Sequence, residues 1–164
     1  MDVEPSAELK YEDGGDSSTR ATEGLANVIG YHLRLAQEAS FAAYARRVGD
    51  THIWPGWYSL LRIIHDNPGI NQTELSIAAG RDKSTLTTSL RELGKAGLVV
   101  KTRDGSDRRN LRLSLSANGE EHLARLENHA LAHDAEIDRI VGSNERARFL
   151  DTLKRLASEL ANQC

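Results

Sequence analysis

Hydroxyl and basic side chains recur at helical spacing between Lys83 and Lys95. Ser84, Thr88, Arg91 and Lys95 follow one another at intervals of four, three and four residues, which places them on one face of a helix. Short hydroxyl side chains let a helix approach base edges and phosphates, and an arginine is long enough for a bidentate contact to guanine. This pattern is typical of a recognition helix in the major groove of DNA, and an ordinary solvated polar face is the alternative. The predicted DNA contacts of this helix are Lys83, Ser84, Thr85, Thr87, Thr88, Arg91 and Lys95.

A second basic element follows the predicted recognition helix. Arg108 and Arg109 lie between Asp107 and Asn110, in a segment expected to form the tip of a hairpin. An arginine on such a tip can enter a narrow A·T minor groove, where the potential is most negative. Asp107 is expected to orient the loop rather than to meet DNA, because phosphates repel a carboxylate. A solvated charged turn is the alternative interpretation.

The distribution of charge supports a polyanion partner for this region. The whole chain of 164 residues has a formal net charge of -3. Residues 71–115 nevertheless contain nine lysines and arginines against five acidic residues, whereas residues 1–20 contain six acidic and two basic residues. A basic segment in an acidic protein is the electrostatic footprint expected where one face meets nucleic acid.

Local signals predict the elements that position these side chains. Asn71 and Glu74 have the spacing of a capping box, which predicts a short helix over 72–79 that ends at Gly80. Asp82 can cap the next helix, over 83–96, which Gly97 closes. Two short helices joined by a tight turn form a helix-turn-helix.

A hairpin is predicted directly after the helix-turn-helix. Leu111, Leu113 and Leu115 alternate with Arg112 and Ser114, which is the period of a half-buried strand. Residues 99–103 are the expected partner strand, and residues 104–110 connect the two. A hairpin at this point of the chain makes a wing.

Longer helices are predicted on both sides of this module. Apolar residues recur every three or four positions over 19–48, which predicts a first helix, and Thr51 can cap a second one with Pro55 in its first turn. After the wing, Ser116 can cap a helix that reaches Val141, and residues 144–161 are expected to form the last helix. The end helices have apolar stripes that a module of about 45 residues is too small to cover. A second copy of the chain is therefore the expected partner.

The expected fold class is mainly α with a small β-hairpin wing, a winged helix-turn-helix with terminal dimerisation helices. Residues 1–18 are expected to be a disordered acidic leader, and 19–164 a single unit. Within that unit the DNA-binding lobe is expected at about 52–115, and the dimerisation helices at about 19–48 and 116–162. No apolar run is long enough to span a membrane and no secretory signal is evident, so we expect a cytoplasmic protein.

The segment DRRNLRLSLSANG resembles the wing signature of the MarR family of winged-helix regulators. Asp107, Arg109, Leu113, Leu115 and Ser116 follow its D-x-R-x-x-x-L-x-L-[ST] pattern, and the preceding NQTELSIAAGRDKSTLTTSLRELGKAGLV resembles that family's helix-turn-helix. The resemblance covers about residues 25–160, with Ser116 where threonine is commoner. It implies a homodimer on a pseudo-palindromic operator, usually a repressor released by a small ligand, with Arg109 directed at the minor groove.

Aromatic residues cluster where the first two helices are expected to meet. Six of the eight aromatic residues lie within 31–58, and such walls suit a planar organic ligand, although simple packing is the alternative. The predicted ligand-binding residues are His32, Arg34, Arg46, Arg47, Trp54, Trp57 and Tyr58. The helix-turn-helix also resembles, more loosely, that of MarR members that control hydroxycinnamate breakdown and respond to aromatic acyl-CoA esters. The expected effector is an aromatic carboxylate or an aromatic acyl-CoA.

Three competing interpretations remain open. A metal-responsive regulator would use His122, His129 and His133, and a redox-responsive one Cys164. A winged helix that serves only protein contacts would not need the outward hydroxyl and arginine stripe. We expect no enzyme, because the chain lacks the G-x-S-x-G, G-x-x-x-x-G-K-[ST], H-E-x-x-H and G-x-G-x-x-G motifs, and we expect no cofactor.

Overall fold

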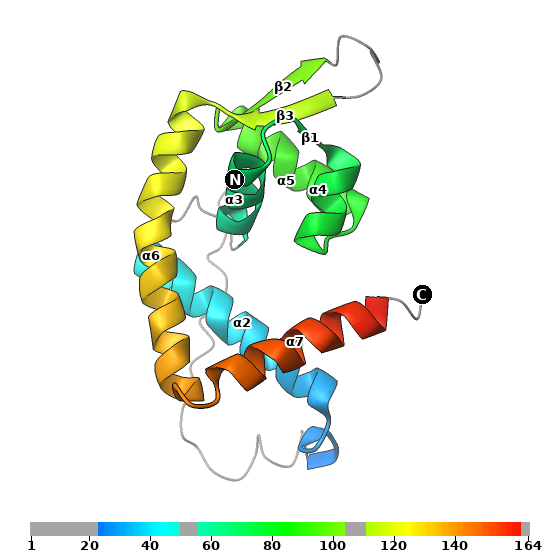
Figure 1. The fold of residues 1–164 in the computed structure, drawn as a ribbon, viewed down its shortest axis with the longest axis vertical. Coiled ribbons are helices and arrows are strands. Elements are labelled where there is room, and N and C mark those ends of the chain that lie inside the picture. Colours follow the sequence, from blue (N-terminus) through cyan, green and yellow to red (C-terminus); the bar gives the residue numbers. More distant parts are fainter. Residues whose placement is uncertain (1–22, 50–55, 104–110, 162–164) are drawn as a thin grey trace, which may run out of the picture. The chain divides into compact units, whose positions relative to one another are not determined.

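The structure, a computed structural model, describes residues 23–49, 56–103 and 111–161. It divides into a unit of residues 1–39 and a unit of residues 40–164, which are considered separately. The first unit contains the 3-10 helix η1 (Glu23–Leu25) and the start of helix α2 (Ile29–Val48) (Figure 1). The predicted leader 1–18 lies outside the described residues, and the expected helix over 19–48 is interrupted, because η1 precedes a helix that begins only at Ile29.

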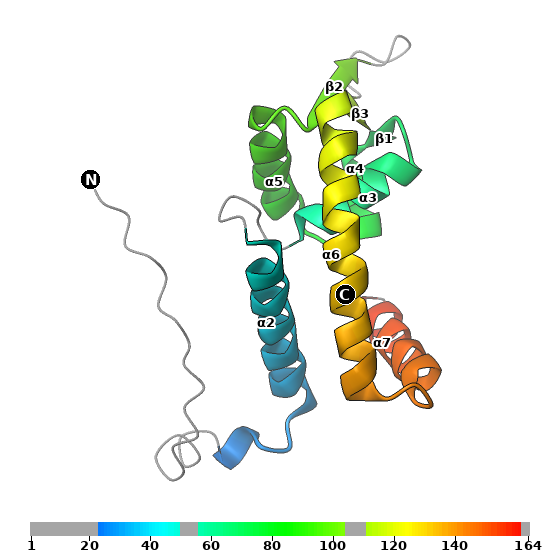
Figure 2. The same cartoon turned by 90° about the vertical axis from the view of Figure 1, so that its left-hand side faces the viewer.

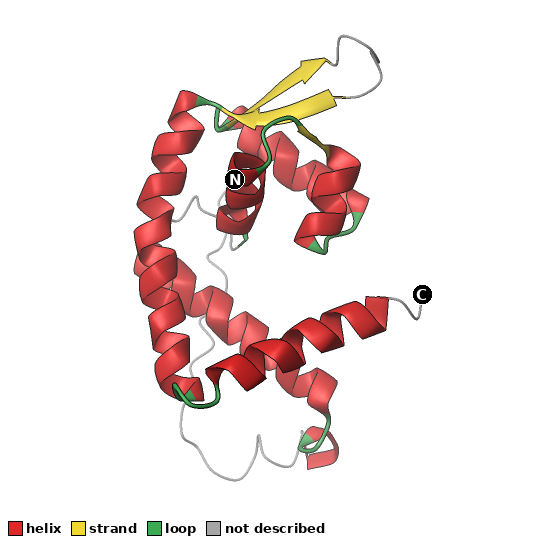
Figure 3. Ribbon diagram, viewed as in Figure 1, coloured by secondary structure: helices red, strands yellow, loops and turns green. Residues whose placement is uncertain are grey.

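The second unit holds the remaining elements in the predicted order. They are α3 (Trp57–Asp66), β1 (Ile70–Asn71), α4 (Gln72–Ala79), α5 (Lys83–Lys95), β2 (Val99–Arg103), β3 (Leu111–Leu115), α6 (Ala117–Val141) and α7 (Arg146–Ala161). Figure 3 shows the fold class as expected, helices with one small sheet. None of the described helices is long and apolar enough to cross a membrane.

The start of α3 corrects one expectation. The helix begins at Trp57 after Gly56, which has a left-handed φ of 93° and, lacking a side chain, makes no capping hydrogen bond. The N-cap is therefore Gly56 and not Thr51 as expected, and Thr51 and Pro55 themselves lie outside the described residues. A glycine suits this junction because a left-handed residue without a Cβ lets the chain turn sharply into the helix.

The three strands form one antiparallel sheet in the order β1-β3-β2. Val99 pairs with Leu115 and Arg103 with Leu111, so the predicted hairpin is confirmed as a wing. The strand β1 was not expected, and it pairs Ile70 with Leu113 in the middle of β3. The sheet therefore joins the wing to the residues that lead into α4.

One hydrophobic core holds the helix-turn-helix, the sheet and the start of α6 together (Figures 1 and 2). Its fully buried side chains come from α3, α4, α5, β3 and α6: Leu60, Leu61, Ile64, Leu75, Leu86, Leu90, Leu93, Leu113 and Leu126. The first turns of α6 belong to this core. Beyond them its apolar residues are exposed, as Leu131 and Ile140 show, and α7 has no buried residue.

Candidate nucleic-acid interface

Helix α5 has one buried and one exposed face, as the sequence predicts. Leu86, Leu90 and Leu93 point into the core, with at most 1% of each residue accessible to solvent. The seven predicted contact residues on α5, from Lys83 to Lys95, are all exposed. The helix therefore offers solvent a continuous surface of hydroxyl and basic side chains.

Asp82 fixes the beginning of this surface. Its carboxylate accepts the backbone N–H groups of Ser84 and Thr85, at 3.0 and 2.9 Å, which confirms the predicted N-cap. It also accepts the Ser84 hydroxyl at 2.5 Å and the Thr85 hydroxyl at 2.6 Å. These hydroxyl hydrogen bonds, followed by those from the backbone, hold the pKa of Asp82 far below its usual range. Because each hydroxyl has one hydrogen, Ser84 and Thr85 present hydrogen-bond acceptors to a binding partner in this conformation.

The next hydroxyls along α5 are bonded to the helix backbone. Thr87 donates to the carbonyl of Lys83 at 2.6 Å, and Thr88 donates to that of Ser84 at 3.3 Å. Their methyl groups and their remaining lone pairs are the parts left for a partner. A thymine methyl is one group that such a methyl can contact.

The basic end of α5 carries its own counter-charge. Glu92 accepts from Nε of Arg91 at 3.2 Å and from Nζ of Lys95 at 3.3 Å. The hydrogen bond from Lys95, and then that from Arg91, lower the pKa of Glu92. Both cations are about two-thirds exposed, so they can exchange this carboxylate for a phosphate or a base edge.

The strands carry further basic residues. Lys101 and Arg103 are exposed on β2, and Arg112 on β3 donates to the Gly69 carbonyl at 3.2 Å. The predicted wing-tip residues Asp107, Arg108 and Arg109 lie outside the described residues. Their contact with DNA stays a prediction.

The turn between α4 and α5 is held by backbone hydrogen bonds and packs against the start of α3. Ser76 donates its hydroxyl to the Arg81 carbonyl at 2.6 Å, and the Arg81 N–H donates to the Ser76 carbonyl at 3.1 Å. The Arg81 guanidinium lies so close to Gly56 that a Cβ at position 56 would overlap Nη2. Position 56 therefore favours glycine for its φ, whereas the flexible Arg81 side chain could move away from a Cβ.

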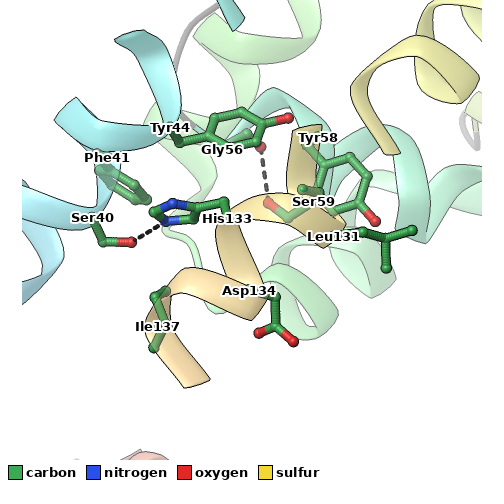
Figure 4. A pocket seen from close by; sticks show the side chains of 11 residues that line it. Ser40, Phe41, Tyr44, Gly56, Tyr58, Ser59, Leu131, His133, Asp134 and Ile137 are labelled. Carbon is green, nitrogen blue, oxygen red and sulfur yellow. Dashed lines mark hydrogen bonds between the residues drawn. The ribbon is translucent and has the colours of Figure 1, made fainter. Parts of the chain in front are cut away.

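Gly56 also lines a pocket of about 430 Å³ within the second unit. Its walls come from the C-terminal half of α2, the first turn of α3 and the middle of α6 (Figure 4). The side chains that line it are mostly apolar or aromatic, with a few polar groups: Ser40, Phe41, Tyr44, Tyr58, Ser59, Ala130, Leu131, His133, Asp134 and Ile137.

His133 is the polar centre of this pocket. Its Nε2 lies 2.9 Å from the Ser40 hydroxyl oxygen (Figure 4). Its ring packs edge to face against the Tyr44 ring, with 5.8 Å between the two ring centroids. Its Nδ1 is buried and has no hydrogen-bond partner among the residues that the structure describes. Burial, and secondarily Tyr58, raise the pKa of Tyr44 to about 12, and the phenol donates to the Leu126 carbonyl at 3.3 Å.

The pocket differs from the predicted ligand-binding set. Of that set, Tyr58 lines it. Trp57 packs in the core instead, Arg47 is paired with Glu136 at 2.6 Å, and Arg46 is exposed. In the first unit, His32 lies 2.8 Å from the Ala26 carbonyl and Arg34 lies over the Tyr31 ring, whereas Trp54 is outside the described residues.

The sequence missed His133 as a pocket residue because its helical spacing suggested a metal ligand. No group of three or more His, Cys, Asp or Glu within 23–49, 56–103 and 111–161 is arranged to hold a metal ion. His133 is bonded to Ser40 and His122 to Arg125, and His129 does not line the pocket. Cys164 lies outside the described part of the chain.

Comparison with known proteins agrees with this geometry. The model of the MarR family matches residues 55–111, which contain the helix-turn-helix and most of the wing. A putative transcriptional regulatory protein for the hcr operon of Thauera aromatica is 33% identical over 133 residues, which are 80% of each chain.

Two similar solved structures extend the likeness to nearly the whole fold. The transcriptional repressor CouR bound to a 23-mer DNA duplex has a TM-score of 0.75 and 31% identity, over 83% of this chain and 96% of CouR. CouR has also been solved with p-coumaroyl-CoA. The regulator PcaV of Streptomyces coelicolor, in complex with its natural ligand, has a TM-score of 0.77 and 27% identity, over 82% of this chain and 94% of PcaV.

Proposed function

The chain belongs to the MarR family of DNA-binding transcriptional regulators, and from this premise we propose that it is a homodimeric repressor released from its operator by an aromatic ligand. One observation carries the proposal: the same unit contains two features. They are the exposed face of α5, with its hydroxyl and basic side chains, and a pocket with aromatic walls formed by α2, α3 and α6. The first feature reads DNA, and the second senses the ligand.

The dimer is supported by apolar residues that the single chain leaves uncovered. On α7, Phe149 and Leu150 are about 40% exposed and Leu160 is 56% exposed, and the spacing of eleven residues places Phe149 and Leu160 on the same face of the helix. A second subunit would bury these side chains and favour association. Two recognition helices would then enter successive major grooves about 34 Å apart on a pseudo-palindromic operator.

The pocket chemistry favours a planar aromatic group with few charges. Its described lining contains one carboxylate, Asp134, which is paired with Arg146 at 2.8 Å, and contains no lysine or arginine. A free carboxylate could thus bind only to hydroxyl groups and to His133, without a cationic partner. A phenolic ring could pack against the edges and faces of the aromatic side chains and form hydrogen bonds with the polar ones. We therefore favour an aromatic acyl-CoA, with its ring in the pocket, over the free acid. The binding of p-coumaroyl-CoA by CouR supports this choice.

Gly56 offers a route from the pocket to the DNA-binding face. Gly56 lines the pocket and also lies next to the Arg81 guanidinium. Arg81 lies in the turn directly before Asp82, the N-cap of α5. A ligand that shifts Gly56 would displace this turn and the start of the recognition helix. A preference of the ligand for the shifted state amounting to about 1–3 kcal/mol would weaken operator binding about 5- to 150-fold.

The proposal is tested by fluorescence anisotropy with the full chain and labelled DNA from upstream of its own gene. We expect specific binding that p-coumaroyl-CoA reverses, that p-coumarate reverses less, and that CoA alone leaves unchanged. Release by p-coumarate alone would assign the free acid instead. Binding that no aromatic compound reverses would contradict the ligand assignment while leaving DNA recognition intact.

Two matched variants on α6 sharpen this test. His133→Leu removes the polar centre of the pocket, so it should abolish release while preserving operator affinity. His129→Leu makes the same change one turn earlier on the same helix, outside the lining, and should respond like the wild type. Equal responses of both variants would argue against this pocket as the ligand site.

A further inference from the structure

Gln72 connects the first helix of the helix-turn-helix to the recognition helix. It is the first residue of α4, directly after the N-cap Asn71. Its side chain takes no part in the capping box and instead crosses to α5, where Nε2 donates to the Thr87 hydroxyl oxygen at 2.7 Å. Nothing in the local spacing of the sequence shows that position 72 reaches position 87.

The hydrogen-bond directions at Thr87 fix the orientation of the Gln72 amide. The single Thr87 hydroxyl hydrogen is donated to the Lys83 carbonyl at 2.6 Å, so Thr87 must accept from its other neighbour. Gln72 therefore turns its nitrogen toward Thr87. The carbonyl Oε1 and the second amide hydrogen remain for another partner.

These remaining groups lie beside the DNA-facing surface of α5. At about 100° per residue, Thr87 borders the face formed by Ser84 and Arg91, on the side that faces α4. Gln72 is half-buried and Thr87 is exposed, and the bond from Nε2 to Thr87 holds the amide at this border. The surface that meets DNA thus extends from α5 onto the first residue of α4.

We propose that Gln72, held in place by Thr87, is a base-reading residue that recognises adenine in the major groove. One N–H donor and one C=O acceptor on the same amide match the N7 acceptor and the N6 donor on the exposed edge of adenine. Thr87 donates its hydroxyl hydrogen to the Lys83 carbonyl, so it does not donate to DNA. Its role is to position Gln72 by accepting the hydrogen bond from the Gln72 amide. The proposal rests on the DNA-binding role of α5 and is independent of the effector.

The test compares base preferences of the full-length protein and its variants. Operator sequences are first selected from a random duplex pool with the wild type, and relative affinities are then measured for every single-base change. Gln72→Met keeps the length of the side chain and the helix propensity but removes the amide. We expect it to lose a preference for adenine of about 5- to 150-fold at one position in each half-site, with preferences elsewhere unchanged.

The Thr87 variants test the positioning step. Thr87→Val removes the hydroxyl and should weaken the same preference as Gln72→Met, and the double variant should lose no more than Gln72→Met alone. Thr87→Ser restores the hydroxyl and should restore the preference. Additive losses at two different base positions would overturn the link between the two residues.

Ser89→Ala is the matched control. Ser89 also donates its hydroxyl to the helix backbone, to Thr85 at 3.1 Å, but lies on the opposite flank of α5. We expect wild-type preferences from this variant, and melting temperatures will confirm that all variants fold. Equal weakening of all sequences by Gln72→Met, or no change at all, would overturn the proposal.

Discussion

Gly119→Ala should disrupt the junction between the wing and α6. Gly119 is buried in the first turn of α6, and a Cβ there would overlap the Leu98 carbonyl oxygen while lying 3.0 Å from the Leu98 carbonyl carbon and 3.3 Å from Cβ of Leu115. That carbonyl cannot easily move, because it also accepts the Ser116 N–H at 3.0 Å. The helix would have to retreat by on the order of 1 Å to restore normal contact.

The expected cost follows from these contacts. Overpacking a rigid site costs about 1–3 kcal/mol, and loss of the hydrogen bond between Ser116 and Leu98 adds about 1 kcal/mol. A loss of about 2–4 kcal/mol in the free energy of unfolding corresponds to a melting temperature lower by roughly 5–15 °C in a chain of this size. Thermal and urea unfolding followed by circular dichroism measure both quantities.

Gly94→Ala provides the opposite control in the same lobe. Gly94 lies within α5, and a Cβ there would meet nothing within 4 Å. Alanine is favoured over glycine in a helix by up to about 1 kcal/mol, so this variant should be slightly more stable than the wild type. A stable Gly119→Ala protein, or equal effects of the two substitutions, would refute the steric argument.

Three further predictions concern α5. Glu92→Gln removes the carboxylate shared by Arg91 and Lys95, so operator affinity should rise about two- to fivefold per protomer at low salt and less at high salt; an unchanged affinity in a salt titration would contradict this. Arg91→Ala should relax base preference, whereas Lys95→Ala should mainly flatten the salt dependence, and equal effects of both on all sequences would argue against these roles. Because the folded-state pKa of Asp82 is lowered, its stabilisation is complete above the ordinary carboxyl pKa of about 3.9 and is lost as the pH falls below it. The difference in melting temperature between the wild type and Asp82→Asn should therefore stay constant from pH 7 to 5 and change below pH 4, and a constant difference down to pH 3 would contradict the assignment.

Elements defined by local interactions were predictable from the sequence. The limits of α4, the capping box of Asn71 and Glu74, and the Asp82 and Ser116 caps agree with the structure, because each depends on residues within one helical turn. The exposed face of α5 was predictable for the same reason. Its leucines repeat at the helical period and leave the hydroxyl and basic residues outside.

Features that depend on distant residues were not predictable in this way. The pocket brings Ser40, Tyr58 and His133 together from three helices, and no spacing rule relates these positions. The bond between Gln72 and Thr87 likewise depends on how α4 crosses α5. The helix start after Gly56 was missed because Thr51 and Pro55 form a signal typical of a helix N-terminus, whereas α3 begins after a left-handed glycine that makes no side-chain cap.

The small strand β1 has a consequence for the order in which the lobe folds. Asn71 pairs with Arg112 in the sheet and also caps α4, so one residue belongs to a local turn and to a contact about forty residues away. Helices α4 and α5 form from neighbouring residues, whereas this pairing must first close a long loop, which is entropically costly. We therefore expect the capping box of α4 to form early from its own residues, and the pairing of Asn71 with Arg112 to form only after the wing. The Gly69 N–H, which donates to the Leu113 carbonyl at 2.8 Å, should accordingly exchange with solvent together with the amide protons of β3, as one cooperative opening.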